Sequence, residues 1–558
     1  MRQYNRMKSR VVWRSLVVVG ACLPLVGARH AAPLQSVLPR AALTPQDSAL
    51  HALSRLAYGP RPGDVPRVAA EGVMRWIDHQ LSPDGIDDDR LAERERRFDI
   101  LRHDRGDLAA MYTAAQRERR ERKLAAGETA QDSDRLPDPM MLKNRRVASE
   151  FADLAVVRAT LSQRQLYEVM VDFWTNHFNV YFAKGADRFL TPDYIEHTIR
   201  PRAMGKFQDL LIATARSPAM LFYLDNWESV APGSVPPTGL HVRARPIFGR
   251  RPGLFGPARD PARQDSVRRR ALERMPKGIN ENYARELLEL HTLGVDGGYT
   301  QQDVIDVARI FTGWSIEPPE RGSGFVFHDW AHDEGDKIVL GQTFKGDGED
   351  EGIRLLKFLA NQHATMHHVS AKLCARFVAD DPPDGCVDAA VAAWQKSRGD
   401  IRAVLRAIFT SPDFWSPQAV RAKVKTPVEF VVSAVRAAGV EPDDTPRLAQ
   451  MVARLGEPLY QQPAPTGYAE TEAHWVNSGA LLARMNAAMV LAKECSSIPT
   501  IDDHGQLVDA IDQKLLAGTM SEHTRSVILE QLTDINDPAQ ARAMAVGLAL
   551  GGPDFQKQ

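Results

Sequence analysis

Residues 151–177 read FADLAVVRATLSQRQLYEVMVDFWTNH, and the spacing of their apolar side chains decides the fold class. Apolar residues return every three or four positions, from Phe151 to Leu161 and again from Leu166 to Trp174. That period matches the 3.6 residues per turn of an α-helix and lines up one apolar face for burial. The stretch therefore predicts two consecutive helices in the core of the protein.

The helical period extends in both directions from this stretch. Upstream, Thr44 to Asp47 (TPQD) has the composition of a helix start, with Thr44 as the N-cap and a proline at the first helical position. Downstream, helical patterns return at 279–293, at 302–312 and from residue 352 to the end, whereas parts of 325–344 look extended. We therefore expect an all-α, multi-helix globular fold with a small β-hairpin near 325–344.

Two segments depart from the regular pattern. Residues 86–139 are highly charged and predict an exposed helical arm. Residues 231–276 contain eight prolines, five glycines and ten arginines, and predict a long loop of the kind that is either functional or disordered. We expect a linker at 29–43 and then a single helical domain over 44–558 that carries this arm and this loop.

Residues 1–28 have the pattern of a secretory signal peptide. Five positive charges precede an apolar stretch at 15–28, and no acidic residue occurs before Asp47. The stretch is shorter than the roughly 20 residues of a membrane-spanning helix, so we expect no stable transmembrane anchor. The mature protein is predicted to be periplasmic or secreted. Lipidation at Cys22 is disfavoured because the apolar run continues past it to Ala28.

Three cysteines remain after such processing: Cys374, Cys386 and Cys495. Cys374 lies in a helical pattern, and Cys386 follows the turn at 381–385 (DPPDG), where a chain reversal brings the two close together. In an oxidising compartment we expect these two to lie close enough for a disulfide. The alternative is that all three are small buried apolar residues.

Composition and missing motifs exclude several functional classes. Lys plus Arg total 70 against 71 for Asp plus Glu, so the chain lacks the basic field of a nucleic-acid-binding protein. It contains no phosphate-binding loop, dinucleotide-binding glycine fingerprint, nucleophile elbow or His-Glu-x-x-His zinc motif. The commoner nucleotide-binding, esterase and zinc-protease functions are therefore excluded.

Three blocks carry a family resemblance: 51–60 (HALSRLAYGP), 171–180 (VDFWTNHFNV) and 280–294 (NENYARELLELHTLG). They resemble the signature blocks of a bacterial exported family catalogued as domain of unknown function 1800, and supporting matches extend the resemblance over 45–556. The resemblance implies an exported, mostly helical protein. It also implies a candidate partner, a second exported uncharacterised protein encoded nearby, but no established activity.

The 280–294 block is the first candidate for chemistry. On a helix Glu281, Arg285, Glu286 and Glu289 fall on one polar arc of about 140°, whereas His291 falls on the opposite, apolar side. One interpretation is a metal or catalytic site that takes further ligands from elsewhere in the fold. The other is a ladder of i,i+4 ion pairs, each worth about 0.2–0.5 kcal/mol.

Two histidines are the other candidates. His332-Asp333 lies in a loop rich in glycine and aspartate, where functional residues are common. His177 lies on the apolar face of its helix, which is typical of a hydrogen-bonded core histidine but also allows a contribution to a site. We predict a catalytic set of His332, Asp333, Glu286, Glu289 and Arg285. The candidate cofactor is a divalent metal, with Glu281, Glu286, Glu289 and His177 as its ligands.

Three functions fit these residues. The first is an extracytoplasmic, hydrolase-like and metal-assisted enzyme, which uses the catalytic set above. The second is a non-catalytic helical scaffold in which the same polar blocks form buried ion networks. The third is a binding protein of the cell envelope that uses the arginine-rich loop at 241–274. The sequence names neither the substrate nor the reaction.

Overall fold

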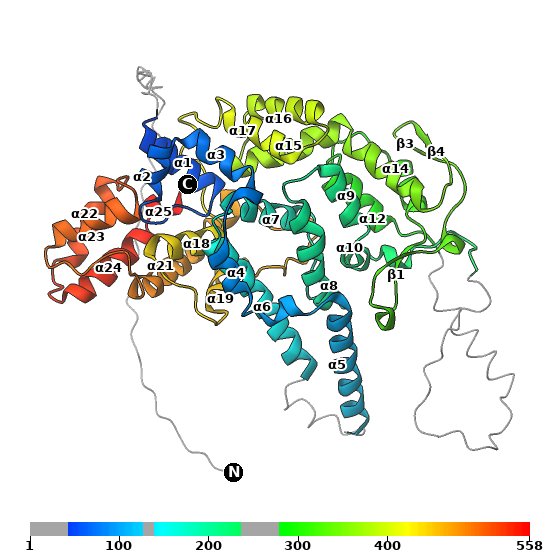
Figure 1. The fold of residues 1–558 in the computed structure, drawn as a ribbon, viewed down its shortest axis with the longest axis horizontal. Coiled ribbons are helices and arrows are strands. Elements are labelled where there is room, and N and C mark those ends of the chain that lie inside the picture. Colours follow the sequence, from blue (N-terminus) through cyan, green and yellow to red (C-terminus); the bar gives the residue numbers. More distant parts are fainter. Residues whose placement is uncertain (1–42, 126–138, 236–277) are drawn as a thin grey trace, which may run out of the picture. The chain divides into compact units, whose positions relative to one another are not determined.

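Helices form almost all of the regular structure, so the predicted all-α class is confirmed (Figure 1). The computed structural model describes residues 43–125, 139–235 and 278–558. Four predicted segments lie wholly or partly outside the described residues: the signal peptide at 1–28, the linker at 29–43 (up to residue 42), the charged arm at 86–139 (from 126 to 138) and the loop at 231–276 (from 236 on).

The first half of the chain contains the two helices predicted from the 151–177 stretch, α6 and α7. The α-helices of this half are α1 (Pro45–Leu56), α2 (Asp64–Glu71), α3 (Val73–Gln80), α4 (Asp89–Glu95), α5 (Arg105–Ala125), α6 (Pro139–Leu161), α7 (Gln165–His177), α8 (Asp187–Asp193), α9 (Phe207–Ala215) and α10 (Pro218–Tyr223). Helix α1 begins as predicted, because Thr44 and Asp47 form a capping box in which Thr44 Oγ1 accepts from the Asp47 N–H at 3.1 Å.

The second half begins with the predicted 280–294 helix and the strands. Its elements are α12 (Glu281–Glu286), the π-helix η7 (Leu287–His291), α13 (Gln301–Ile310), β1 (Trp314–Ile316), β2 (Phe325–Phe327), β3 (Lys337–Val339), β4 (Gln342–Phe344), α14 (Glu349–Ala360), α15 (His363–Phe377), α16 (Asp384–Ser397) and α17 (Ile401–Thr410). The C-terminal helices are α18 (Pro427–Ala438), α19 (Arg447–Arg454), α20 (Glu472–Trp475), α21 (Ser478–Lys493), α22 (His504–Leu515), α23 (Glu522–Leu532), α24 (Pro538–Gly551) and α25 (Pro553–Gln556).

The extended residues near 325–344 form two small hairpins instead of one. Strand β2 pairs with β1, which lies upstream of the predicted segment, and β3 pairs with β4. The second hairpin closes on itself because Leu340 and Gly341 both have positive φ, at 50° and 77°. Two such residues form the tight turn whose twist suits neighbouring antiparallel strands.

Helix α18 lies inside the core, because every residue from Pro427 to Ala438 is buried. Its charged side chains therefore need partners. Arg436 donates from Nε to the Gly59 carbonyl and from Nη1 to the Thr160 carbonyl, both at 3.0 Å. The buried apolar side chains around it belong to one continuous cluster that extends from Ala49 to Phe555.

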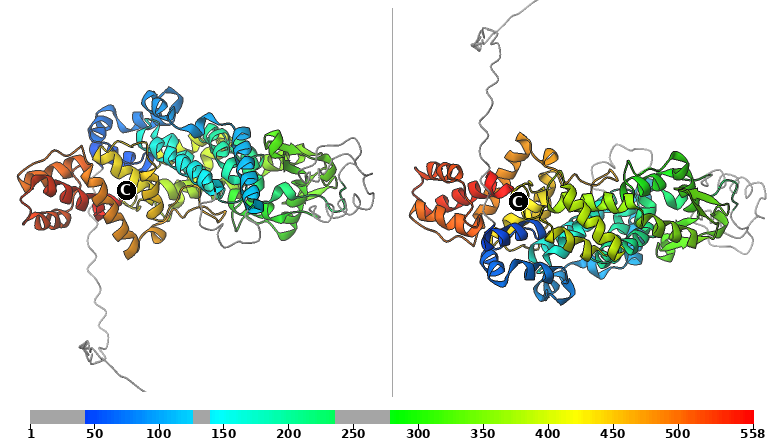
Figure 2. Two further views of the ribbon diagram at one scale, coloured as in Figure 1. Left: turned by 90° about the horizontal axis from the view of Figure 1, so that it is seen from below. Right: turned by 90° about the horizontal axis from the view of Figure 1, so that it is seen from above.

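Helices α21 and α24 pack side by side near the end of the chain, and the C-terminal helices, coloured orange to red, stay grouped in every view (Figures 1 and 2). Their approach depends on two glycines of α24. A Cβ atom on Gly547 would lie 2.1 Å from the sulfur of Met489, and one on Gly551 would lie 2.6 Å from that of Met485. Among the described residues no helix is long and apolar enough to cross a membrane.

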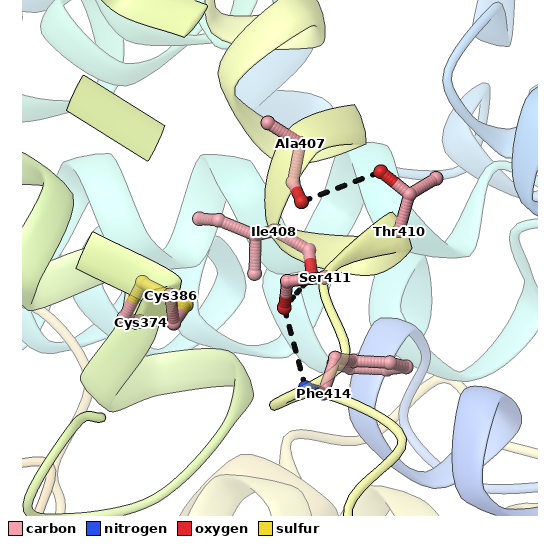
Figure 3. Close-up of a disulfide and its surroundings, with 7 residues drawn as sticks. All are labelled: Cys374, Cys386, Ala407, Ile408, Thr410, Ser411 and Phe414. Carbon is pink, nitrogen blue, oxygen red and sulfur yellow. Dashed lines mark hydrogen bonds between the residues drawn. A yellow bond between two sulfur atoms is a disulfide. The ribbon is translucent and has the colours of Figure 1, made fainter. Parts of the chain in front are cut away.

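The predicted proximity of Cys374 and Cys386 is confirmed by a disulfide between α15 and α16, with the Cα atoms 6.3 Å apart (Figure 3). Helix α16 starts at Asp384, so the predicted turn reverses the chain between the two cysteines. Both cysteines are fully buried, and Cys495 is a buried free thiol. The bridge therefore fixes α15 against α16 inside the core.

Removal of this bridge should lower the free energy of unfolding by about 3 kcal/mol, because the closed loop restricts the unfolded chain. The measurement is urea-induced unfolding of the Cys374→Ala/Cys386→Ala variant against the oxidised wild type. Cys495→Ala is the control for loss of a buried sulfur outside the bridge. Equal stability of the double variant and the oxidised wild type would contradict the prediction.

Candidate functional site

The polar arc of α12 divides into two parts. Glu281 and Arg285 form an i,i+4 ion pair at 3.5 Å, with about 40% of each side chain exposed. Gln301 bridges them, because it donates to Glu281 at 2.8 Å and accepts from Arg285 at 2.9 Å. An exposed pair of this kind contributes little to stability. This part of the arc matches the ion-ladder interpretation.

Glu286 and Glu289 form the other part of the arc. Tyr299 donates its hydroxyl to Glu289 at 3.4 Å. Partial burial and the neighbouring Glu289 raise the pKa of Glu286, against the attraction of Arg285. Within the described residues neither carboxylate forms a hydrogen bond or ion pair with His332 or His177. The structure therefore does not bring the predicted catalytic set together through direct contacts.

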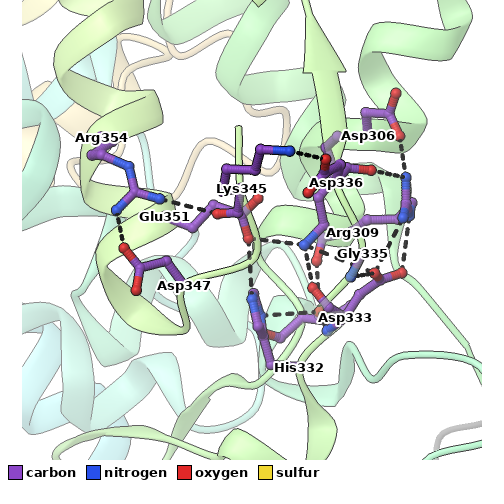
Figure 4. A network of polar contacts seen from close by, with 12 residues as sticks. Asp306, Arg309, His332, Asp333, Gly335, Asp336, Lys345, Asp347, Glu351 and Arg354 are labelled. Atoms are coloured by element: carbon purple, nitrogen blue, oxygen red, sulfur yellow. Dashed lines mark hydrogen bonds and ion pairs between the residues drawn. The ribbon is translucent and has the colours of Figure 1, made fainter. Parts of the chain in front are cut away.

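His332 lies in a buried network that the sequence did not reveal (Figure 4). Its Nε2 lies 3.1 Å from Glu351 Oε2, and its Nδ1 lies 3.0 Å from the Thr312 carbonyl oxygen. Both neighbours are hydrogen-bond acceptors of the protein itself, so neither ring nitrogen is free for a ligand. Lys337 Nζ lies 2.8 Å from the same Glu351 oxygen, and the side chains of Lys337 and Glu351 are fully buried. The network fixes the second hairpin to α14.

Asp333 is held by α13. Arg309 donates to both of its carboxylate oxygens, at 2.9 and 3.1 Å, and the Gly335 N–H donates to one of them at 2.9 Å. Partial burial opposes ionisation, but these bonds hold the pKa of Asp333 below its ordinary value. His332 and Asp333 thus bind different partners, and both use their polar atoms on the protein itself.

His177 lies in the core among aromatic rings. Its Nε2 lies 3.3 Å from the His291 carbonyl oxygen, and its ring centroid lies 6.2 Å from that of His291 and 6.5 Å from that of His368. Burial lowers the pKa of all three, to about 3 for His291 and about 4 for His368. They are therefore neutral at physiological pH.

The four predicted metal ligands are not gathered in this structure. No group of three or more His, Cys, Asp or Glu side chains that could hold a metal ion occurs in the described parts of the chain. The predicted divalent metal therefore stays a prediction, which the metal content of the purified protein would test.

A cavity of about 70 Å³ lies elsewhere, among the N-terminal end of α18, α7, α15 and the segment 455–471 that joins α19 to α20. Its lining includes the charged or hydroxyl-bearing side chains of Tyr58, Asp172, Arg376, Glu457 and Glu470. A water molecule occupies about 10–15 Å³ on this measure, so the cavity has room for several waters or a small polar group. We call it the Asp172 cavity.

Asp172 is the carboxyl group that this cavity leaves without a close partner. Its nearest charged neighbour is Arg376, with 3.8 Å between Oδ2 and Nη2, which is too long for a hydrogen bond. Within the described residues the carboxyl group forms no hydrogen bond; 31% of the side chain is exposed, and Asp172 lines the cavity. Burial raises the pKa of Asp172 to about 7, helped by Glu470 and Glu429 and opposed by Arg376.

Arg376 is buried and contacts three carboxylates. Besides Asp172, its Nη1 lies 2.8 Å from Glu429 Oε1 and 3.1 Å from Glu470 Oε2. Burial opposes the ionisation of Glu429, but Arg376 holds its pKa below the ordinary value. Glu457 has no such partner: it accepts a hydrogen bond from the Val428 N–H at 2.9 Å, and burial beside Asp172 raises its pKa well above the ordinary value.

The cavity wall at 455–471 is anchored to α7 and the residues after it. Asn176 donates to the Tyr468 carbonyl at 2.9 Å and accepts from the Tyr468 N–H at 2.6 Å. Asn179 donates to the carbonyls of Gln462 and Ala464. Gly467 has a φ of +73°, and a Cβ atom there would lie 2.4 Å from Asn176. The two asparagines of the DFWTNHFN block thus hold an irregular segment in place.

The sequence contained a partial signal for this site. Asp172 and Asn176 lie on the polar side of the helix whose apolar side carries His177, so the same block marks both. On α15, His368, Lys372 and Arg376 are spaced four residues apart and share one face. Neither pattern identifies the partner segment, because 455–471 has no helical period.

Comparison with known proteins gives one match. A family model described as protein of unknown function (DUF1800) covers residues 51–557 of the chain. No curated protein and no solved structure matches.

The His332 network allows the contribution of a buried ion pair to stability to be compared with that of an exposed one. Glu351→Ala leaves Lys337 and His332 buried without their carboxylate, so we expect a loss of about 3–5 kcal/mol in the free energy of unfolding. Asp347→Ala is the matched control, because it breaks the exposed pair with Arg354 at 2.5 Å and should change stability by at most about 1 kcal/mol. Urea unfolding followed by circular dichroism measures both. Similar effects of the two substitutions would refute the network.

Substitution of Asp172 should raise the free energy of unfolding, whereas Glu351→Ala should lower it. The folded-state pKa of Asp172, about 7, lies above the unfolded value near 4, so the folded protein loses stability as the pH rises toward 7. Asp172→Asn removes this loss and should raise the free energy of unfolding by about 2 to 4 kcal/mol at pH 8, and by far less at pH 4.5. Urea unfolding at both values tests it. A lower stability of the variant at pH 8 would mean that Asp172 is a structural ion-pair partner.

Proposed function

The chain belongs to the family of proteins of unknown function DUF1800, and from its own residues we propose that it is an acid–base enzyme of the hydrolase type that works in the Asp172 cavity. One observation carries the proposal. A carboxyl group with a pKa of about 7 lines a cavity with room for water and has no hydrogen-bond partner in the described protein. General acid–base catalysis needs a group that titrates near the working pH, and this one does.

The neighbouring groups supply complementary chemistry. Arg376 lies 3.8 Å from Asp172 and carries a fixed positive charge toward the cavity, where it would stabilise negative charge that develops during hydrolysis. Burial raises the pKa of Glu457 well above its ordinary value, which favours the neutral form of this carboxyl group. Asp172 is then the proton-transfer group and Arg376 the anion-stabilising group.

The Asp172 cavity is favoured over the predicted His332–Asp333 pair for a physical reason. Both ring nitrogens of His332 face protein acceptors, and both oxygens of Asp333 accept bonds from protein donors. Such groups have little hydrogen-bonding capacity left for a substrate. Asp172 keeps all of its capacity. The proposal needs no metal ion.

We also propose that the enzyme acts outside the cytoplasm, on the strength of the signal-peptide pattern at 1–28. N-terminal sequencing of the processed protein tests this: the mature chain should begin near Arg29, and an intact N-terminus in fractionated cells would refute it. The family resemblance adds a second exported protein as a candidate partner.

A non-catalytic scaffold is the second candidate function, and the buried contacts of Arg376 favour it. Arg376 joins α7, α15, α18 and the segment 455–471 through three carboxylates, as a structural network would. A scaffold has no use for a carboxyl group that lacks hydrogen bonds and destabilises the fold at neutral pH. The two functions thus differ in what they require of Asp172.

The activity test compares wild type with Asp172→Asn on chromogenic esters, anilides, phosphate esters and glycosides between pH 5 and 9. We expect hydrolysis of at least one class, with a pH–rate limb near 7 that reports Asp172. The variant should lose about 100-fold or more in rate and also lose this limb. Asp347→Asn, which alters an exposed ion pair, is the control and should keep the wild-type profile. Absence of hydrolysis in all four substrate classes, or an Asp172→Asn variant with the wild-type rate, would refute the enzyme function and favour the scaffold function.

A further inference from the structure

We propose that the Asp172 cavity binds the protonated amine of a ligand, with the Asp172 carboxylate as its counter-ion. The inference rests on the proposed function and adds the substrate class: a molecule that carries an ammonium group into this cavity. Four features of the Asp172 cavity support it: its charge balance, its unpartnered polar groups, its aromatic lining and its volume.

The charge balance around Asp172 favours a cation. The charged groups that interact with Asp172 itself are Arg376 of α15, Glu429 of α18, and Glu457 and Glu470 of the segment 455–471. Other cations act on its carboxylate neighbours: Lys423, Lys425, Arg55 and Arg484 on Glu429, and Lys372 on Glu470. Arg376 is shared among three carboxylates. Lys372 interacts with Glu470 and with the three buried histidines. An ionised Asp172 is therefore incompletely neutralised by the protein.

The other two guanidinium groups of the lining are already paired. Arg200 donates to both oxygens of Glu168, at 2.9 and 2.8 Å. Arg158 pairs with Glu95 at 2.6 Å and with Glu196 at 2.5 Å. An anionic ligand would find only Arg376, which already contacts three carboxylates, and would face four lining carboxyl groups. The lining thus disfavours an anion.

Two residues that line this space have side-chain polar groups without a hydrogen-bond partner. The Asp172 carboxyl group has no hydrogen bond, and the Tyr58 hydroxyl has none either within the described residues, although only 3% of Tyr58 is exposed. A buried polar group without a partner is costly and marks a place where a ligand or water completes the bonding. A primary ammonium has three N–H donors and no acceptor, which complements this set.

The aromatic lining and the volume of the Asp172 cavity also suit an ammonium group. Three tyrosines, Tyr58, Tyr460 and Tyr468, line the cavity together with the carboxyl groups. Aromatic rings beside carboxylates are the usual surroundings of bound ammonium groups, because the ring face attracts a cation. A volume of about 70 Å³ suits an ammonium head with a short chain.

The test uses ethanolamine and, as a neutral probe of the same size, ethylene glycol. Ligand-observed NMR titration of the full mature protein measures the affinity of each at pH 6 and pH 8. Asp172 changes from mostly protonated to mostly ionised across this interval. Ethanolamine should therefore bind about tenfold more tightly at pH 8, and ethylene glycol should bind weakly and equally at both.

Asp172→Asn should abolish the pH dependence of ethanolamine binding, and its expected gain in stability ensures that the comparison uses folded protein. Asp347→Asn should keep the pH dependence of ethanolamine binding. Equal affinity for the two probes at pH 8, or pH-dependent ethanolamine binding by Asp172→Asn, would overturn the inference. If ethanolamine fails to bind but Asp172→Asn still loses hydrolysis, the inference falls and the proposed function stands. If ethanolamine binds and nothing is hydrolysed, the proposed function falls.

Discussion

The buried guanidinium group of Arg376 holds together parts of the chain that are far apart in sequence. It reaches Asp172 on α7, Glu429 on α18 and Glu470 on the segment before α20. Removing a charge from water is expensive, and the arrangement is stable only when enough opposite charge surrounds it. Helix α18, which is buried along its whole length, and α7 are thus held in register with α15 by one positive charge.

The same interaction explains why the cavity contains a carboxyl group with a raised pKa. Glu429 and Glu470 take the close positions at Arg376, at 2.8 and 3.1 Å, and leave Asp172 at 3.8 Å. A carboxyl group in that outer position is buried beside like charges but only weakly compensated, so its pKa is raised to about 7. The same weak compensation lowers stability at neutral pH and gives Asp172 the pKa that the proposed acid–base function requires.

The His332 network shows the opposite use of buried charge. Glu351 is fully buried between His332 and Lys337, and both of these groups contact its Oε2. The loop around His332-Asp333 resembled a functional loop because it is rich in polar residues and glycine. Its partner Glu351 lies in the first turn of α14, and its acidic neighbours there resemble an ordinary helix start. Local composition could not distinguish a catalytic histidine from one that fixes a hairpin to a helix.

The sequence by itself determined which segments are helical, because the 3.6-residue period and the capping box at Thr44 are local properties that short stretches encode. It also predicted that Cys374 and Cys386 lie close together, since a turn between them reverses the chain within 12 residues, whereas the structure decided that they are bridged. Only the tertiary structure decided which polar groups meet. Asp172 and Arg376 are about 200 positions apart, and the irregular segment with Glu457 and Glu470 is placed by asparagines of α7 and the residues after it. Charges interact through space, so the pKa that makes Asp172 a candidate acid exists only once these segments are packed together.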